Sequence, residues 1–157
     1  MSHTNGRRFA LPFSLLLVSA LALSPSAVAA QGADGEDAPA YKEYKGVHIG
    51  MTADEARKKL GNPTDKSDKQ DFYAVSDSET VQVFYDNDKK VFAVSVLYMG
   101  AGVASAPTPK AVLGTEVEPA ADGRIHKMVD YPKAGYWVSY SRTGGDTPIV
   151  TVTMQKK

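Results

Sequence analysis

His48 and His126 are the side chains beyond the N-terminal region that are best suited to acid–base or metal chemistry at neutral pH. A catalytic or metal-binding histidine needs partners at hydrogen-bonding or ligand spacing. Neither histidine has a neighbouring His, Cys or Glu pattern, and no G-x-S-x-G nucleophile motif occurs. We therefore expect no catalytic residue, no cofactor and no metal site, and we expect His126, which alternates with Ile125 along a predicted strand, to lie on the surface.

Two short segments carry weaker signals for ion binding. Asp86 and Asp88 have the spacing of the first two ligands of a calcium loop, but the glycine at its sixth position and its terminal glutamate are absent. The Gly-Gly-Asp segment at 144–146 is followed by no predicted helix whose amides could hold a phosphate. Both segments are predicted to be turns between strands.

The aromatic side chains give the strongest functional signal. Tyrosine and tryptophan dominate binding interfaces because they offer a large contact area with few rotamers. In the run Tyr136-Trp137-Val138-Ser139-Tyr140, the two tyrosines and the valine face one side of a strand, and Trp137 faces the other with small polar neighbours. The candidate partner-binding residues are Tyr73, Tyr85, Tyr98 and Trp137. The alternative is that these aromatics are ordinary core and surface residues, with Trp137 covered by the segment 99–109.

Residues 53–60 form the best-defined predicted helix. Thr52 suits the N-cap, and Glu55 stands three residues later, as in a capping box. Gly61 suits a left-handed C-cap, and Pro63 prevents continuation. The cationic run 57–59 is expected on a solvated helix face, or as a contact for an anionic surface. The structural motif comprises Gly50, Thr52, Glu55, Leu60, Gly61 and Pro63.

Six strand-like runs follow this helix, and a shorter helix lies between the third and the fourth. The short helix spans Pro109 to Leu113, with Thr108 as N-cap and Gly114 as its stop. The third run is apolar on both faces, so we expect a central strand that is covered on part of both faces. The strand-like runs are 70–75, 80–86, 90–98, 124–131, 135–142 and 148–155.

This order predicts an α+β fold in which tandem helix-plus-three-strand units form an antiparallel sheet with helices packed on one face. A first unit spans 44–99, a linker 100–109, and a second, degenerate unit of the same domain 110–157. The alternative is one continuous α+β domain without a repeat.

The helix motif also resembles a known family. The pattern Ile49-Gly50-Met51-Thr52-x-x-Glu55-Ala56-x-x-x-Leu60-Gly61-x-Pro63-Thr64, followed by aromatic strands, is similar to that of the BamE (SmpA/OmlA) family and of proteins built like the β-lactamase inhibitory protein (BLIP). BamE-like proteins hold one such unit and act as accessory lipoproteins in outer-membrane protein assembly. BLIP-like proteins hold two, and present an aromatic-rich sheet face to a partner protein. The resemblance is good over 49–98 and poor over 108–155. Ala56 stands where valine is usual.

The N-terminal segment has the layout of a secretory signal peptide. Arg7 and Arg8 precede an apolar run over 9–23, and small residues then end in an Ala-x-Ala pattern, which predicts cleavage after residue 29 or 30. An uncleaved anchor is the alternative, but the run is shorter than the roughly 20 residues of a bilayer span. The prediction is a signal peptide over 1–30, a disordered leader over 31–43, and a secreted or periplasmic protein with no membrane span after cleavage.

Composition narrows the class of partner. The chain has no cysteine, hence neither a disulfide nor a site for the lipid anchor of BamE-type proteins. It holds 18 basic and 18 acidic residues, and the signal peptide would remove two arginines, so the exported part is slightly acidic and a poor match for nucleic acid.

Together, these features predict an exported, non-enzymatic protein-binding module that uses an aromatic sheet face. Its partner would be another protein, and a component of the cell envelope is one candidate. The alternatives are an envelope-assembly accessory factor of the BamE type and a small secreted hydrolase. The hydrolase would require a buried acid or histidine with a shifted pKa in a cleft.

Overall fold

The computed structural model describes residues 38–157. The predicted signal peptide, 1–30, and the start of the predicted leader, 31–37, lie outside the described residues. The described part contains the α-helices α1 (Ala53–Leu60) and α2 (Pro109–Leu113), the 3-10 helix η1 (Gly100–Ser105), and the strands β1 (Asp65–Lys66), β2 (Gln70–Ser76), β3 (Glu79–Tyr85), β4 (Val91–Tyr98), β5 (Ile125–Tyr131), β6 (Tyr136–Arg142) and β7 (Val150–Lys156).

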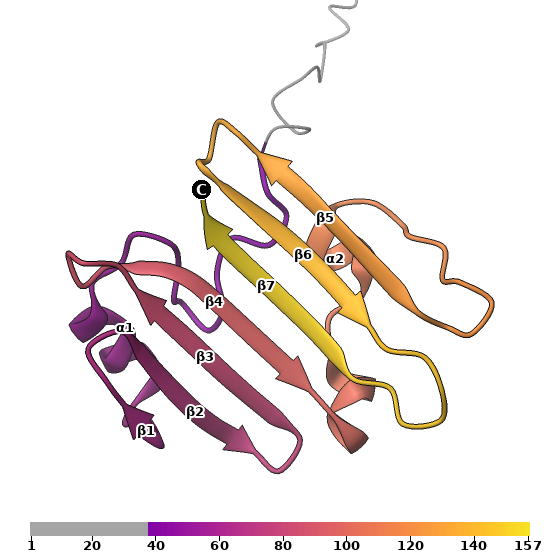
Figure 1. The fold of residues 1–157 in the computed structure, drawn as a ribbon, viewed down its shortest axis with the longest axis horizontal. Coiled ribbons are helices and arrows are strands. Elements are labelled where there is room, and N and C mark those ends of the chain that lie inside the picture. Colours follow the sequence, from indigo (N-terminus) through magenta and orange to yellow (C-terminus); the bar gives the residue numbers. More distant parts are fainter. Residues whose placement is uncertain (1–37) are drawn as a thin grey trace, which may run out of the picture. The chain divides into compact units, whose positions relative to one another are not determined.

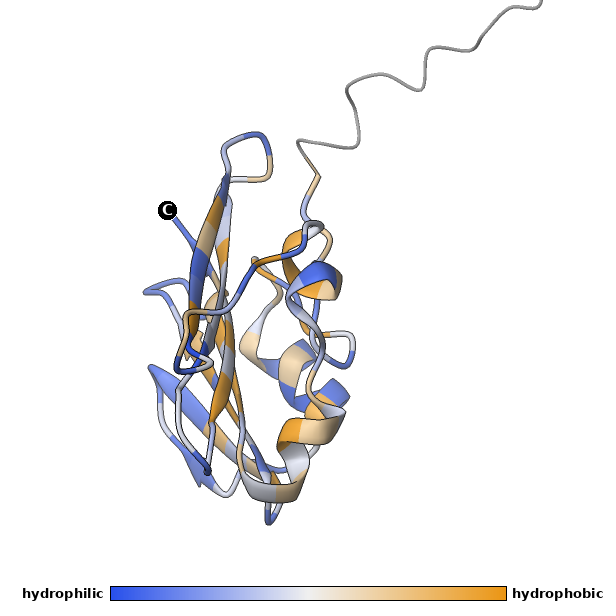
Figure 2. Ribbon diagram, turned by 90° about the vertical axis from the view of Figure 1, so that its right-hand side faces the viewer, coloured by the Kyte–Doolittle hydropathy of each residue, from blue (hydrophilic) through white to orange (hydrophobic). Residues whose placement is uncertain are grey.

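The seven strands form one sheet in the order β1-β2-β3-β4-β7-β6-β5, and every neighbouring pair is antiparallel (Figure 1). β4 and β7 therefore lie side by side at the centre, although more than fifty residues separate them in sequence. The helices lie on one side of the sheet (Figure 2). The α+β class and the antiparallel sheet with helices on one face agree with the sequence prediction.

The ends of α1 follow from the motif that predicts them. Thr52 Oγ1 accepts the N–H of Glu55 at 3.3 Å, and the Glu55 carboxylate accepts the N–H of Thr52 at 3.0 Å, which completes the capping box. The predicted left-handed C-cap at Gly61 is wrong. The φ of Gly61 is +84°, but its ψ of −156° lies outside the left-handed helical region. Pro63 disfavours helical backbone at the preceding Asn62, so the helix does not continue past Gly61. The left-handed cap occurs instead on α2, at Gly114.

The core lies between the sheet and the helices and is built largely of valine. The strands β3, β6 and β7 bury alternate residues, as expected for a sheet with one covered face. The fully buried large side chains are Tyr85, Met154, Val47, Val81, Val83, Val91, Val94, Val96, Val112, Val138, Val150 and Val152. The second face of the central strand β4 is not covered by another described helix or strand, which corrects that expectation (Figure 2).

Two segments that were predicted to be irregular pack against this core. Tyr41 contacts the core cluster and Pro39 is buried, so the end of the predicted disordered leader is part of the folded structure. The predicted linker over 100–109 contains η1, and Val103 packs against the same cluster. Apolar side chains in otherwise small or polar segments explain both corrections. Because η1 packs on the core, it does not cover Trp137 on the opposite side of the sheet.

Among the described glycines, Gly102 in η1 leaves the least room for a Cβ. A Cβ at this position would stand 2.5 Å from the backbone oxygen of Ser78, an oxygen that already accepts the N–H of Met99. We expect Gly102→Ala to lower the free energy of unfolding by about 1–3 kcal/mol, because one of the two backbones must move. Urea denaturation measures this loss, and the exposed Ala101→Ser is the control, with an effect within about 0.5 kcal/mol. Equal midpoints for Gly102→Ala and the unsubstituted chain would contradict this packing.

Candidate functional site

The side chains of β2–β7 that point away from the helices form what we call the open face. Their positions follow from the strand register and the alternation of burial. Three rows cross the four central strands β3, β4, β7 and β6 in that order. The rows are Phe84, Ala93, Gln155 and Trp137; Gln82, Ser95, Thr153 and Ser139; and Thr80, Leu97, Thr151 and Ser141.

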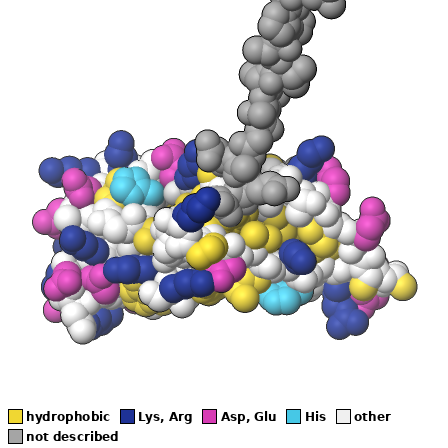
Figure 3. All heavy atoms as spheres, turned by 90° about the horizontal axis from the view of Figure 1, so that it is seen from above, with side chains coloured by type: hydrophobic (Ala, Val, Ile, Leu, Met, Phe, Trp, Pro, Cys, Tyr) yellow, Lys and Arg dark blue, Asp and Glu magenta, His cyan; other side chains and the backbone are white. Residues whose placement is uncertain are grey.

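These central rows hold no charged side chain, although 23% of the chain is charged. Depletion of charge at the centre and a polar rim are typical of protein interfaces. Hydroxyl groups occupy the middle, where Ser95 and Thr153 are hydrogen-bonded across the strands at 3.0 Å. Figure 3 shows the molecule from above, relative to Figure 1. On that surface, Lys and Arg side chains lie among Asp and Glu side chains. Met128 on the neighbouring strand β5 is 55% exposed and extends the apolar part of the open face.

A β-bulge shapes one end of the open face. The register of β3 and β4 shifts so that Phe84 pairs with Ala93 and Tyr85 with Val91, which leaves Phe92 without a partner. A bulge of this kind re-aims a side chain, and bulges are common next to functional sites. Phe92 is thereby brought beside Phe84, with ring centroids 6.1 Å apart and ring planes tilted by 52°.

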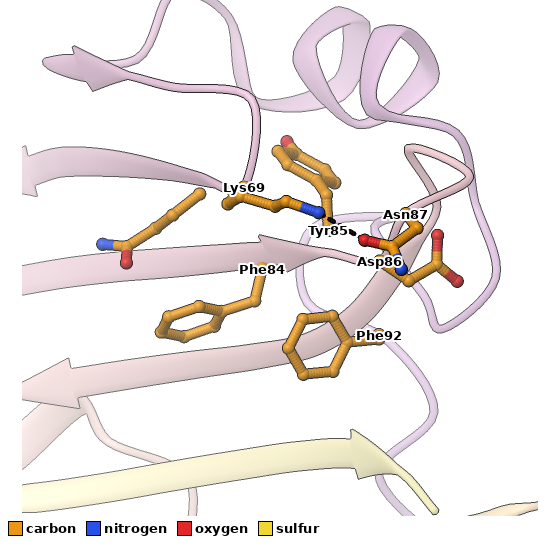
Figure 4. Close-up of a pocket in the computed structure, with 7 residues that line it drawn as sticks. Lys69, Phe84, Tyr85, Asp86, Asn87 and Phe92 are labelled. Atoms are coloured by element: carbon orange, nitrogen blue, oxygen red, sulfur yellow. Dashed lines mark hydrogen bonds between the residues drawn. The ribbon is translucent and has the colours of Figure 1, made fainter.

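The two phenylalanines line a hollow of about 490 Å³ at the end of the open face (Figure 4). Its other lining residues are Lys69, Gln70, Tyr85, Asp86 and Asn87.

The rim of the hollow is held by internal hydrogen bonds. Lys69 Nζ donates to Asn87 Oδ1 at 2.5 Å. Asp86 Oδ1 accepts the backbone N–H groups of Asp88 and Lys90, each at 2.9 Å. The Asp86/Asp88 pair is therefore a turn, as predicted from the sequence. Each charged rim residue is already engaged within the protein.

Trp137 lies on the open face, half-buried, and pairs with Asp130 and Gln155. The adjacent Tyr136, Val138 and Tyr140 are buried on the helix side, as the alternation predicts.

The other three candidate contact residues are not on this face. Tyr73, Tyr85 and Tyr98 are 4%, 1% and 7% exposed and belong to the core. Their assignment as contact residues is therefore wrong. Each shares its strand phase with buried side chains: Tyr85, for example, follows Val81 and Val83 at alternate positions.

A buried polar cluster on the helix side of the sheet accounts for the burial of Tyr73 and Tyr85, because it gives their hydroxyl groups an acceptor. Asp71, which is completely buried, accepts hydrogen bonds from Arg57 Nε at 2.8 Å, Arg57 Nη2 at 3.1 Å, Tyr85 Oη at 2.7 Å and Tyr73 Oη at 3.4 Å. The Arg57 guanidinium also lies 5.5 Å from the centroid of the Tyr85 ring. Arg57 is thus not part of a solvated face, which corrects the sequence prediction.

The pKa shifts of the cluster have clear causes. Burial opposes ionisation of Asp71, but the hydrogen bonds from Arg57 and Tyr85 outweigh it and hold the pKa of this carboxyl below its usual value. Burial, reinforced by the nearby Asp71 charge, raises the pKa of Tyr73 to about 12. Burial and the hydrogen bond to Asp71 raise the pKa of Tyr85 further. Asp71 is therefore ionised at neutral pH and committed to Arg57, which is the arrangement of a structural ion pair and not of a general acid.

The two histidines and the acidic residues do not converge. His48 and His126 are exposed, and the described part of the chain contains no group of three or more His, Cys, Asp or Glu side chains that could hold a metal ion. Within residues 38–157, no helix has the length and apolar character needed to cross a membrane.

No family model and no curated protein matches the sequence. Among solved structures, a DUF4309 family protein (YjgB) from Bacillus subtilis subsp. subtilis str. 168 is similar over 72% of this chain and 84% of its own, with 15% sequence identity and a TM-score of 0.47. Similarity this low assigns neither a fold family nor a function. The BamE and BLIP resemblance therefore stays a sequence-based prediction.

Proposed function

We propose that this chain is an exported, non-enzymatic binding module whose open face contacts a protein partner. The observation that carries the proposal is the combination on one uncovered sheet face of a charge-free centre with Trp137 and the Phe84–Phe92 pair. Sheets normally cover an apolar face with another layer, and an aromatic, charge-depleted surface that lacks one has the composition of an interface. Export rests on the signal-peptide pattern at the N-terminus.

We also propose that the chain consists of two tandem units, α1 with β2–β4 and α2 with β5–β7. Three features support this. In each half, a threonine-capped helix that ends at a glycine precedes three antiparallel strands. The last strands of the halves, β4 and β7, pair with each other. The two open faces are thereby joined into a single surface.

Fluorescence of Trp137, the only tryptophan of the chain, tests the proposed function. In the free protein we expect efficient quenching by acrylamide, because the indole lies half-buried on an uncovered face. Binding of the partner should reduce the quenching constant severalfold, since the interface excludes solvent. An indole that is already protected in the free protein, or one whose quenching the bound partner leaves unchanged, would contradict the proposal.

A further inference from the structure

The strand β5 ends the sheet with an edge that pairs with no other described strand (Figure 1). The opposite end of the sheet is β1, which has only two residues, both charged and exposed. Short, charged end strands are a common protection against pairing with another chain. β5 has seven residues, contains no proline and pairs with β6 without a register shift. Its outer edge is therefore a regular template for a further strand.

One hydrogen bond shows which backbone groups of β5 point toward β6. The oxygen of Gly135 accepts the N–H of Lys157 at 3.1 Å, so the adjacent pair of Tyr136 and Lys156 is a pair without mutual hydrogen bonds between β6 and β7. The N–H and C=O of Tyr136 therefore point to the other side, toward Tyr131 on β5. Tyr131 in turn directs its own backbone groups toward β6.

Backbone groups alternate in direction along a strand, so every second residue of β5 directs its N–H and C=O away from the sheet. These residues are His126, Met128 and Asp130. All three are exposed, and no backbone-to-backbone hydrogen bond within residues 38–157 reaches their outward N–H and C=O groups. Met128, at 55%, is also the most exposed large apolar side chain of the described part. The edge thus offers both unpaired backbone groups and apolar surface.

The sequence of this edge is complementary to itself. When a second copy of β5 runs antiparallel to the first with Met128 facing Met128, His126 of each copy stands opposite Asp130 of the other. An imidazole N–H can donate to a carboxylate, and opposite-charge pairs across strands are stabilising. No like charges face each other, and all seven residues of the strand are paired. Asp130 also pairs with Lys157 of its own copy, and a carboxylate can accept more than one donor.

The neighbouring registers are less favourable. Paired side chains must share a face, so the centre of the pairing moves from residue to residue along the strand. A centre at Lys127 sets two lysines directly opposite each other, which is destabilising. A centre at Val129 sets His126 opposite Pro132, which has no N–H to donate. The residues of the strand therefore select the register that is centred on Met128.

We infer that two copies of this chain pair edge to edge through β5, antiparallel and centred on Met128, so that the sheet continues from one copy into the other. The twofold axis stands perpendicular to the sheet, which leaves the helices of both copies on the same side and joins the two open faces. Trp137, which pairs with Asp130 on β6, lies one strand from the junction in each copy. The inference adds a second copy of the chain to the proposed function and does not depend on it.

Sedimentation velocity tests the association, with the exported protein purified after expression from the full sequence. We expect a dimer with a dissociation constant between about 1 µM and 1 mM, because one pair of strands buries a small interface. Met128→Pro should weaken association at least about tenfold, since it removes an outward N–H and leaves the bonds to β6 in place. Met128→Val, which keeps the N–H, is the matched control. Thermal unfolding checks that both variants are folded.

Thiol crosslinking tests the register, because the chain has no cysteine of its own. Across the axis, the two copies of residue 128 face each other with Cα atoms about 5.5 Å apart, whereas the two copies of residue 126 are more than about 12 Å apart. With bismaleimidoethane, a short crosslinker, we expect Met128→Cys to give a covalent dimer at least about tenfold faster than His126→Cys does. Lys58→Cys, at an exposed position on α1, should give none.

A monomer at every concentration up to about 1 mM, equal crosslinking of the cysteine variants, or unchanged association of Met128→Pro would overturn the inference. A monomeric chain whose Met128 amide exchanges more slowly once a different protein is bound would assign the edge to that protein. The Trp137 quenching experiment reports on the open face and does not require a dimer. Failure of the dimer and failure of the proposed function are therefore distinguishable.

Discussion

Replacing Asp71 with alanine is expected to lower the free energy of unfolding by about 3 kcal/mol or more. The substitution leaves the Arg57 guanidinium without the partner that it contacts through two nitrogens, and it leaves the Tyr85 hydroxyl, in a nearly fully buried residue, without its acceptor. Removing one member of a buried ion pair costs roughly 3–5 kcal/mol. The lower end applies because the Arg57 side chain is 21% exposed and can recruit water. Chemical denaturation at neutral pH measures the loss.

Asp54 provides the matched control for Asp71. Its carboxylate also pairs with Arg57, at 3.6 Å, but its side chain is 88% exposed. Asp54→Ala should therefore change stability by no more than about 0.5 kcal/mol, as exposed ion pairs do. Similar losses of stability for Asp71→Ala and Asp54→Ala would contradict the claim that burial makes the Arg57–Asp71 pair the more important of the two.

Acid titration gives an independent check on the same pair. The pKa of Asp71 is lower in the folded state than its usual value, so its contribution is complete above about pH 4, the range of an unfolded aspartate. That contribution is lost as the pH falls through the folded-state pKa. The unsubstituted chain should therefore lose more stability below about pH 4 than Asp71→Ala does.

The largest expected effect on binding follows from Trp137→Ala. Trp137 belongs to a row without charged side chains, and Asp130, its neighbour on the edge strand β5, is paired with Lys157. An aromatic residue at a charge-depleted centre with a polar rim has the surroundings of an interface hot spot, and truncation of a hot spot costs about 2 kcal/mol or more. We expect the dissociation constant for the partner to rise about 30-fold or more. Isothermal titration measures the change, and Lys58→Ala, an exposed position on the helix side, should leave affinity unchanged. An unchanged affinity of Trp137→Ala would remove this residue from the contact surface.

The local elements of the fold could be predicted because their signals are local. The Thr52–Glu55 box and the glycine that follows define α1 to the residue, and Thr108 with Pro109 does the same for α2. The six long strands occur within two residues of their predicted bounds. The sequence does not predict the two-residue strand β1 or the helix η1, because short polar or small-residue segments form them through tertiary contacts that carry no periodic signal.

The candidate site was only partly predictable. Trp137 was placed on the correct side of β6 because Tyr136, Val138 and Tyr140 form the more apolar phase. The same argument applied to β3 separates Val81, Val83 and Tyr85 from Thr80, Gln82 and Phe84, and would have assigned Tyr85 to the core. Residue type alone does not distinguish a core tyrosine such as Tyr85 from a contact residue, whereas strand phase does.

Phe92 and the Asp71 cluster depend on features that a single sequence does not display. The bulge shifts the phase of β4 by one residue, so Phe92 and Ala93 share a face against strict alternation. Arg57 and Asp71 are fourteen residues apart and meet only because α1 packs on β2. In the sequence alone, Arg57 is therefore not distinguishable from the exposed Lys58 and Lys59 that follow it.

Site-specific photo-crosslinking tests the central claim, that the open face is the contact surface, most directly. A photoreactive phenylalanine derivative replaces Ser139, in the middle row of the open face, or Lys58, exposed on α1, and the variant chains are irradiated in the exporting cell. We expect the Ser139 position to yield one major crosslinked protein species that disappears when Trp137→Ala is combined with it, and the Lys58 position to yield none. The same species crosslinked from Lys58, or no species from Ser139, would contradict the account.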